Sequence, residues 1–392
     1  MKYYVKYILQ KLIALCLLPF RLLPIRQNRI LFLSLEGGSA WEYSCNPRAF
    51  CEYLLAEAPD EYEIVWLFRE PEKYAFLHKK GIRTARHFTL QGIAYALTSR
   101  IVVTNGGYLT WFPFRRGQLC INTWHGGGAY KRLENDMAGA NRATRKRMEY
   151  SARHTTAFVS TCEAFSRLVI RDGFLYKGEI LPIGMPRNDI FFSPACEERS
   201  RSVREELGLP ASCRLALYAP TFRPAGTRKE ALPAEALLDY LMKQTSEDWR
   251  LLYRAHIQAE DAADPAGRDS RILDVTSYPE TQSLLCAADL LITDYSSILW
   301  DYTLTDRPVL LFTPDLEDYT AKRGFYYDIR DWGFPLCQNS SELLTALEET
   351  LTGAHRDASA HHRALLGSYE TGHACEELLR YLRQASSSSI RS

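Results

Sequence analysis

The stretch 290–302, LLITDYSSILWDY, contains the pattern that decides the fold. Residues 290–293 form a short apolar run of the kind found in buried strands, and the run breaks at Asp294. Two serines, Ser296 and Ser297, then lead into the N-terminus of a helix. A strand, a polar turn and a helix form the repeating unit of parallel α/β sheets, so the stretch predicts a fold of that class.

The same unit recurs in both halves of the chain. Apolar runs that end in polar or glycine-containing turns lie at 30–35, 64–68, 101–104, 119–124 and 157–160, and again at 215–218, 249–254, 272–275, 290–293 and 308–312. Strands that alternate with helices favour a parallel sheet with helices on both faces. The polar stretch 193–210 interrupts the rhythm, and its charge run 197–206 is typical of a solvated helix face.

We therefore predict two Rossmann-like domains, residues 29–192 and 193–384. Residues 385–392 contain four consecutive serines and are predicted to be a disordered tail. In sheets of this class, ligands gather at the carboxyl ends of the strands. Residues directly after strands are therefore the first candidates for a site.

Residues 1–28 combine basic, aromatic and apolar side chains. The apolar run 12–20 is too short to cross a bilayer, which takes about 20 apolar residues, and no small-residue cleavage site follows it. We interpret 1–28 as a helix on the cytoplasmic face of the membrane, with a cleaved signal peptide and a helix packed on its own domain as alternatives. The side chains expected at headgroups and anionic lipid are Tyr3, Tyr4, Tyr7, Phe20, Lys2, Lys6, Lys11, Arg21, Arg26 and Arg29.

Composition excludes several classes of function. The 392 residues include 48 Lys and Arg against 47 Asp and Glu, so no overall basic field points to a nucleic-acid partner. The ten cysteines form no CxxC pair, and neither an HExxH motif, a Walker A loop nor a GxGxxG motif is present. We therefore expect no metal and no cofactor, and mostly reduced, buried thiols.

The strongest candidate for a general base is His125, which ends an apolar run and precedes three glycines in NTWHGGG. Only this histidine and His256, of the nine, directly follow clear apolar strands. An imidazole at such a position, beside backbone that can approach a phosphate, suits acid–base chemistry, although a lone histidine is more often structural. By contrast, His361 and His362 lie in a charged helical region and are expected at the surface.

The second half supplies groups that suit a diphosphate. Thr221 follows the run 215–218, and Arg254 and His256 alternate on one side of an extended segment. Ser296 and Ser297 exceed what capping alone requires, although capping stays open as an alternative. Arg187 in GMPRND could project toward the ligand or belong to a plain loop, and for Glu42 and Asn46 loop packing is the more economical interpretation.

These segments together resemble the CDP-glycerol glycerophosphotransferase family, the teichoic-acid polymerases and primases. The matching stretches are NTWHGGGAYKRL at 122–133, GMPRND at 184–189, YAPTFR at 218–223, RAH at 254–256, DVTSYPE at 274–280, LITDYSSILWDY at 291–302 and parts of 307–329. The chain departs from the family at Gly127 and Gly128, where Thr-Pro is more frequent, and at Ile257.

The resemblance implies a GT-B architecture of two Rossmann-like domains, with the donor bound mainly by the second. It implies catalytic roles for His125 and His256. It also assigns seven residues to the donor: Arg187, Thr221, Arg254, His256, Ser296, Ser297 and Asp301. We add further predicted donor-binding residues from the same motifs: Trp124, Gly126, Gly127, Gly128, Pro220 and Thr276.

The implied reaction moves glycerol phosphate, or a related polyol phosphate, from CDP-glycerol to a hydroxyl of a cell-envelope polymer or lipid-linked glycan, releasing CMP. The expected partners are the CDP-polyol, the polymer or lipid-linked acceptor and the membrane surface, and no nucleic acid. A GT-B glycosyltransferase that uses a nucleotide sugar for surface polysaccharide synthesis is the first alternative. A non-catalytic, membrane-surface polymer-binding protein is the second.

Overall fold

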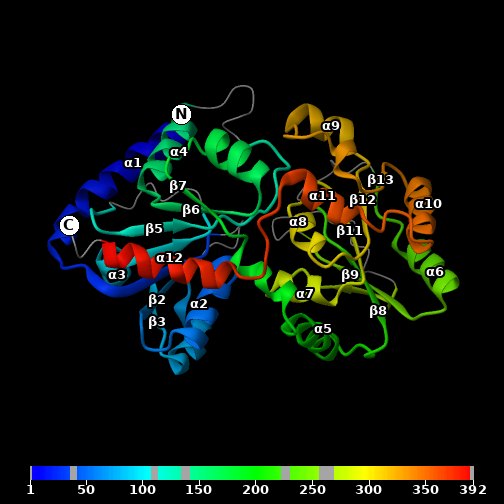
Figure 1. Ribbon diagram of the computed structural model, residues 1–392, viewed down its shortest axis with the longest axis horizontal. Helices are drawn as coiled ribbons and strands as arrows, with labels where there is room; N and C mark the ends of the chain where they lie inside the picture. Colours follow the sequence, from blue (N-terminus) through cyan, green and yellow to red (C-terminus); the bar gives the residue numbers. More distant parts are fainter. Residues whose placement is uncertain are drawn as a thin grey trace. The chain divides into compact units, whose positions relative to one another are not determined.

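A computed structural model describes residues 2–35, 42–106, 114–133, 142–221, 230–255 and 269–388. The chain forms two compact units (Figure 1). The first unit comprises Met1–His125, Leu133–Asp189 and Tyr369–Ser392, and the second comprises Gly126–Arg132 and Ile190–Ser368.

The first unit is built on a seven-stranded parallel sheet with the order β3-β2-β1-β4-β5-β6-β7. Its strands are β1 (Arg26–Leu33), β2 (Glu63–Phe68), β3 (Arg83–Arg86), β4 (Ser99–Thr104), β5 (Leu119–Asn122), β6 (Ala157–Ser160) and β7 (Glu179–Pro182). The order reverses direction between β1 and β4. Polar residues at the carboxyl ends of β4 and β5 therefore lie next to that switch point, where parallel sheets bind ligands.

Alternation along β1 fills both faces of this sheet. Ile30 and Phe32 belong to one apolar cluster, whereas Leu31 and Leu33 belong to the cluster on the opposite face. The first face is covered by α2 (Cys45–Glu57), and α3 (Leu90–Thr98) packs on the second. Because successive side chains of a strand point to opposite faces, a run of apolar residues buries both sides.

The last helix, α12 (Ala374–Ser388), belongs to the first unit and not to the second, to which the sequence assigned it. Its side chains Leu378, Leu379 and Leu382 join the cluster that contains Ile30 and Phe50, and it lies beside α2 (Figure 1). An amphipathic helix does not reveal from its own sequence which sheet it covers. The helix also extends into the predicted disordered tail as far as Ser388.

The second unit has a six-stranded parallel sheet with the order β10-β9-β8-β11-β12-β13. Its strands are β8 (Arg214–Tyr218), β9 (Trp249–Tyr253), β10 (Ile272–Asp274), β11 (Leu290–Thr293), β12 (Val309–Phe312) and β13 (Leu336–Cys337). Its helices are α5 (Ala195–Glu206), α6 (Ala234–Thr245), α7 (Thr281–Ala287), α8 (Ile298–Thr303), α9 (Leu316–Lys322), α10 (Ser340–Leu351) and α11 (Ala358–Leu366). The strand–turn–helix pattern predicted for 290–302 is present as β11 and α8.

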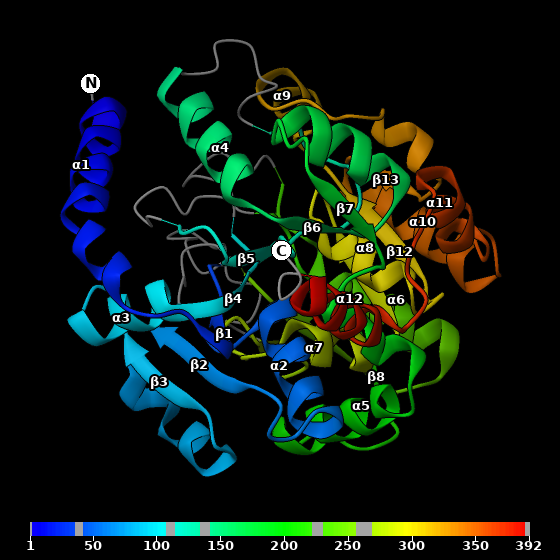
Figure 2. The ribbon, with the colours of Figure 1, turned by 60° about the vertical axis from the view of Figure 1, so that its left-hand side comes forward.

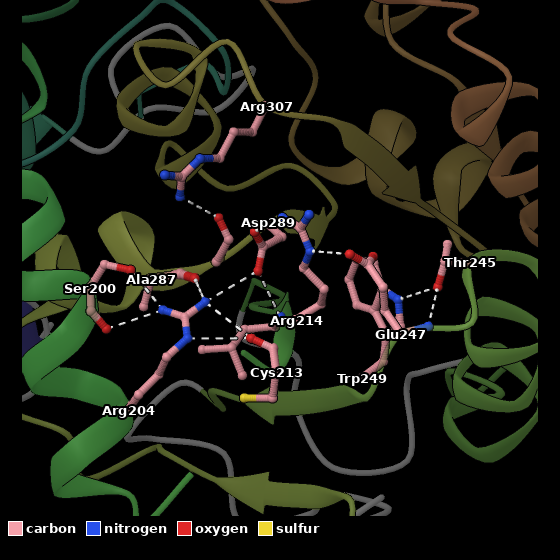
Figure 3. Close-up of polar contacts among 12 residues, drawn as sticks. Ser200, Arg204, Cys213, Arg214, Thr245, Glu247, Trp249, Ala287, Asp289 and Arg307 are labelled. Atoms are coloured by element: carbon pink, nitrogen blue, oxygen red, sulfur yellow. Dashed lines mark hydrogen bonds and ion pairs between the residues drawn. The ribbon is translucent and has the colours of Figure 1, made fainter. Parts of the chain in front are cut away.

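Charged residues fix the amino-terminal edge of this second sheet (Figure 3). Arg204 of α5 donates to the carbonyl oxygen of Cys213 and lies 3.3 Å from a carboxylate oxygen of Asp289, which also pairs with Arg214 at 2.9 Å. Arg214 in turn binds Glu247 at 3.0 Å. Part of the charge run 197–206 is therefore an anchor between α5 and the sheet, and the opposite, carboxyl edge carries the candidate site.

The N-terminal segment begins with α1 (Lys2–Cys16), followed by a short 3₁₀ helix, Leu18–Leu22. The strand β1 starts at Arg26, earlier than predicted. Arg29 is 5% exposed and binds Glu63 and Thr98, so the prediction that it faces lipid is wrong. Among the helices of the described residues, none is both long and apolar enough to cross a membrane.

Candidate active site

The candidate base lies just past the carboxyl end of β5. Asn122 ends the strand, and its side-chain oxygen accepts from the backbone N–H of Trp124 at 2.8 Å. Trp124 has a φ of 52°, a left-handed conformation that is uncommon for a bulky residue. This tight turn presents His125 directly after the sheet instead of continuing the strand.

The imidazole of His125 is held in a defined orientation. Its Nδ1 lies 3.1 Å from the carbonyl oxygen of Asn105, at the end of β4, and its ring packs on Trp124 with centroids 4.2 Å apart. A carbonyl oxygen can only accept, so Nδ1 carries the proton. The lone pair of the neutral ring therefore lies on Nε2, as a general base requires.

Arg187 and Asn46 hold the backbone around this histidine. The guanidinium of Arg187 donates to the carbonyl oxygen of His125 at 2.8 Å and to the sulfur of Cys45 at 3.0 Å. Asn46 donates to the carbonyl oxygen of Trp124 at 2.9 Å and accepts from the backbone N–H of Arg187 at 3.2 Å. Arg187 is 8% exposed and Asn46 fully buried, so this structure gives both a positioning role.

The turn that carries Arg187 is fixed by two carboxylates within the same unit. Glu370 accepts from the backbone N–H of Met185 and the side chain of Asn188, each at 3.0 Å. Asp189 accepts from the backbone N–H groups of Ala374 and Cys375, at the start of α12. The return of the C-terminal segment to the first unit thus locks the turn beside His125.

The three glycines after His125 are buried and pack on protein instead of presenting an open loop. A Cβ on Gly127 would lie 2.1 Å from Cδ1 of Trp300, and one on Gly128, whose φ is +66°, would meet the ring of Tyr130 at 2.6 Å. At these two positions, glycine is required by close side-chain packing within the second unit. Their predicted contact with the donor stays a prediction.

The segment that follows these glycines is docked by backbone pairing. Lys131 forms an antiparallel bridge with Phe325, and the N–H of Tyr326 donates to the carbonyl oxygen of Tyr130 at 2.9 Å. The hydroxyl of Tyr130 lies 2.9 Å from Nε2 of His362, whose Nδ1 lies 2.9 Å from the carbonyl oxygen of Trp332. His362 is fully buried, so its predicted surface position is wrong, and burial lowers its pKa to about 4.

Thr221 and Asp294 meet at the carboxyl edge of the second sheet. The hydroxyl of Thr221 donates to a carboxylate oxygen of Asp294 at 2.6 Å, and the backbone N–H of Thr221 donates to the same oxygen at 2.8 Å. Asp294 also accepts from the backbone N–H of Tyr295. Pro220 is buried in the strand-to-loop turn. These contacts bring together the loops after β8 and β11, neighbouring strands of the sheet.

Arg254 and Thr276 bring the loops after β9 and β10 together. The guanidinium of Arg254 donates to the carbonyl oxygens of Val275 at 3.1 Å and Tyr278 at 2.8 Å. The hydroxyl of Thr276 accepts from the backbone N–H of Ala255 at 2.9 Å. Both of these acceptors are neutral carbonyl oxygens of the loop after β10. The second histidine, His256, lies outside the described residues.

The paired serines are half-buried and stand at the start of α8. Ser297 occupies the N-cap position but makes no side-chain capping bond, whereas Ser296 accepts from the N–H of Ile298 at 3.4 Å. Asp301 is 2% exposed and accepts from Gln282 of α7 at 3.1 Å. The structure thus gives Asp301 a supporting contact inside the unit, and its direct contact with the donor stays a prediction.

Sequence reasoning missed the residues that orient the candidates. Asn105, Asp294, Gln282 and Glu370 act through hydrogen bonds to groups that are distant in sequence, which no local pattern reveals. Asn105 and Asp294 each follow a strand directly, and this position is the one feature of the sequence that could have indicated them. Within the described ranges, no three His, Cys, Asp or Glu side chains are grouped so that they could hold a metal ion.

Comparisons with known proteins agree with these motifs. The chain is 29% identical over 343 residues to the teichoic acid poly(glycerol phosphate) polymerase of Bacillus spizizenii, covering 84% of this chain and 85% of that protein. It is 28% identical to the Bacillus subtilis polymerase of the same name, covering 83% of this chain but 44% of that longer protein. A solved structure of the wall teichoic acid polymerase TagF superimposes with a TM-score of 0.80 at 23% identity, covering 93% of this chain and 91% of that one.

This structural likeness confirms an α/β fold of two parallel-sheet domains. A family model described as CDP-glycerol:poly(glycerophosphate) glycerophosphotransferase matches residues 17–384, nearly the whole chain. The family predicted from the motifs is thus confirmed, together with its activity as a transferase that takes glycerol phosphate from CDP-glycerol to a cell-wall polymer. The chain belongs to the CDP-glycerol:poly(glycerophosphate) glycerophosphotransferase family.

Proposed function

We propose that the enzyme transfers glycerol phosphate in a single in-line step, with His125 as the general base and the second unit as the donor-binding half of a GT-B architecture. An acceptor hydroxyl attacks the phosphorus that bears the glycerol. The new P–O bond forms as the bond to the CMP oxygen breaks, and CMP leaves with both electrons of that bond. No covalent intermediate on the enzyme is required.

The orientation of His125 carries this proposal. Because its Nδ1–H donates to the carbonyl oxygen of Asn105, the ring accepts the acceptor's proton at Nε2. Proton transfer by a positioned base contributes about 10² to 10⁴ in rate. Arg187 and Asn46 keep the backbone on both sides of the ring in place, so the base needs little reorganisation when the acceptor arrives.

The donor-binding groups are drawn mainly from the second unit. Arg254 neutralises charge on the diphosphate, and the hydroxyls of Thr221, Ser296 and Ser297 donate to its oxygens. Pro220 and Thr276 lie at the same edge of the sheet, whereas Asp301 acts through Gln282. His256, which lies outside the described residues, is proposed from the sequence alone to help neutralise the diphosphate. Trp124 and the glycines 126–128 contribute by fixing the chain on both sides of His125. A solved TagF variant was soaked with CDPG, which supports a CDP-linked donor for this family.

Purified protein incubated with CDP-glycerol, CDP-ribitol or UDP-sugars, in the presence of a poly(glycerol phosphate) acceptor, tests the activity. We expect CMP release and labelled polymer with CDP-glycerol. Release of UDP from a UDP-sugar, without CMP from either CDP-polyol, would identify a nucleotide-sugar glycosyltransferase instead. Measuring CMP and product together separates transfer from donor hydrolysis.

We further propose that the first unit rests on the cytoplasmic face of the membrane through α1. Along this helix Val5, Ile8, Leu9, Leu12 and Leu15 are 53–61% exposed, a continuous apolar face on a helix that begins with basic residues. The neighbouring α4 (Arg142–His154) is packed against it through Lys11 over the ring of Tyr150. It adds exposed basic side chains that suit anionic lipid: Arg142, Arg145, Lys146 and Arg153.

Vesicle flotation tests the membrane contact. Replacing Ile8, Leu12 and Leu15 by serine should release the protein from vesicles of phosphatidylglycerol, because these side chains are exposed and their loss leaves the core intact. Replacing Leu351 and Leu365, which are exposed in the second unit, is the matched control and should not change flotation. Unchanged flotation of the α1 variant would refute the contact.

A further inference from the structure

A pocket opens beside the edge strand of the first sheet, and none of the residues assigned so far lines it. It has a volume of about 350 Å³ and is lined by Glu163, Ser166, Arg167, Arg171, Ile180, Pro182 and Tyr369. The strand β7 supplies one wall, and the helix Phe165–Gly173, which follows β6, supplies the other. All seven lining residues belong to the first unit.

The helix that forms this wall is a π-helix of nine residues. Such helices are rare, with well under 1% of residues in globular proteins, and those that occur are frequently found at functional sites. Arg167 and Arg171 are four residues apart and both line the pocket. Arg171 is fixed because its guanidinium donates to the carbonyl oxygens of Tyr176 at 3.1 Å and Gly178 at 2.7 Å.

The pocket reaches the same edge of the sheet as His125. Glu163 and Ser166 follow the carboxyl end of β6, and Pro182 is the last residue of β7. In the sheet order, β7 is two strands from β5, which carries His125, a lateral spacing of about 10 Å. A chain-like ligand whose end reaches His125 can therefore extend into the pocket.

A second link runs through Tyr369, whose backbone N–H donates to the carbonyl oxygen of Thr161 at 2.8 Å. The next residue, Glu370, holds the turn that contains Arg187, and Arg187 binds the carbonyl oxygen of His125. A continuous set of contacts therefore connects Tyr369 in the wall of the pocket to Arg187, which positions His125.

The lining fits a ligand in which isolated negative charges alternate with hydroxyl-bearing stretches. Two guanidinium groups and one carboxylate give a formal charge of +1, which is too little for a dense polyanion. Hydroxyls of Ser166 and Tyr369 and the carboxylate of Glu163 can bind polyol hydroxyls, while the arginines bind phosphate. We infer that this pocket binds the phosphodiester–polyol chain of the acceptor, upstream of the hydroxyl that reacts. This inference rests on the proposed function.

Two measurements on the full-length protein test the pocket. The first is calorimetric binding of poly(glycerol phosphate) oligomers of increasing length without donor, and the second is transfer kinetics with the oligomer concentration varied. Arg167→Gln should weaken oligomer binding and raise the acceptor KM by about three- to tenfold, with kcat and the donor KM within twofold. Glu163→Gln should lower the acceptor KM, because it removes the one negative charge from the lining.

Arg201→Gln, which removes an exposed arginine from α5 in the second unit, is the control for loss of surface charge and should change neither quantity. The inference is overturned if turnover is normal and all three variants bind the oligomer like the unaltered protein. Oligomer binding that depends on Arg167, with no CMP released from any CDP-polyol, would support the pocket and refute the proposed reaction.

Discussion

The carboxyl edges of the two sheets hold their polar side chains in different ways. In the first unit, Arg187 and Asn46 bind the backbone around His125, and His125 itself binds a backbone carbonyl oxygen. In the second unit, Arg254 also binds backbone carbonyl oxygens, but the hydroxyl of Thr221 binds a carboxylate side chain and Ser297 makes no capping bond. Backbone anchors fix one side chain in one place, whereas hydroxyl and carboxylate pairs can exchange partners. A side chain fixed in one place suits the proposed base in the first unit, whereas side chains that can change partners suit the proposed donor site in the second.

The largest effect is expected from breaking the backbone anchor of the base. Arg187→Gln removes the donor to the carbonyl oxygen of His125, and a misplaced base should lower kcat by about 10²-fold. Arg204→Gln removes another partly buried arginine that binds carbonyl oxygens, at the far edge of the second sheet (Figure 3). That control should lower thermal stability without lowering kcat of the folded enzyme. A kcat within threefold for Arg187→Gln would show that the anchor is not needed.

The next effect concerns the dependence of stability on pH. The buried imidazole of His362 accepts a hydrogen bond from the hydroxyl of Tyr130, which lies in the segment that follows His125. Its pKa is lowered to about 4 in the folded protein by burial, below an ordinary value of about 6.5. The unfolded chain therefore binds the proton more tightly, and stability present above about pH 6.5 is lost as the pH falls toward 4. The loss is at most about 3 kcal/mol.

Urea denaturation at several pH values checks this expectation. His362→Gln should flatten the pH dependence of the free energy of unfolding between pH 6.5 and 4. His361→Gln, next to it on the exposed side of α11, should leave that dependence unchanged. The same slope in all three proteins would contradict the role given to His362.

On the donor side, Arg254→Gln should raise the KM for CDP-glycerol by about tenfold, because it removes one charge-assisted contact to the diphosphate. The acceptor KM should not change. Arg250→Gln, on β9 itself and paired with Asp248, is the matched control and should leave the donor KM as it is. If both substitutions act alike, Arg254 holds the loop after β10 and does not bind the donor.

The smallest effect separates capping from ligand binding. Ser297→Ala should leave stability within about 0.5 kcal/mol, since its hydroxyl makes no capping bond, and raise the donor KM a few-fold. Asn339→Ala removes the side-chain cap of α10 and should cost about 1 kcal/mol without a kinetic effect. The reverse pattern, a loss of stability with Ser297→Ala and an unchanged KM, would restore the capping interpretation of the paired serines.

Local patterns predicted the elements well. Each short apolar run that ended in a polar turn became a parallel strand, because runs such as Ile30 to Leu33 bury both faces of a sheet. The sequence did not reveal that α12 returns to the first unit, because its leucines would fit either sheet. Nor did it reveal the contact of Gly127 with Trp300, which joins residues far apart in the chain.

For the candidate site, the sequence indicated residues but not the contacts that hold them. His125 was proposed as the base because it follows a strand, whereas the orientation of its ring depends on the carbonyl oxygen of Asn105, which the sequence did not indicate. Arg187 and Asp301 are charged residues of the motifs GMPRND and LITDYSSILWDY, but burial and hydrogen bonds give both a supporting position. A single sequence cannot distinguish an arginine that binds a phosphate from one that binds a carbonyl oxygen.

The most direct test of the account is the kinetics of His125→Gln, with CDP-glycerol as donor and poly(glycerol phosphate) as acceptor. We predict that kcat falls by about 10² to 10⁴, while CDP-glycerol binding measured by calorimetry stays within twofold. A kcat within tenfold of the unaltered enzyme would contradict the assignment of His125 as the base.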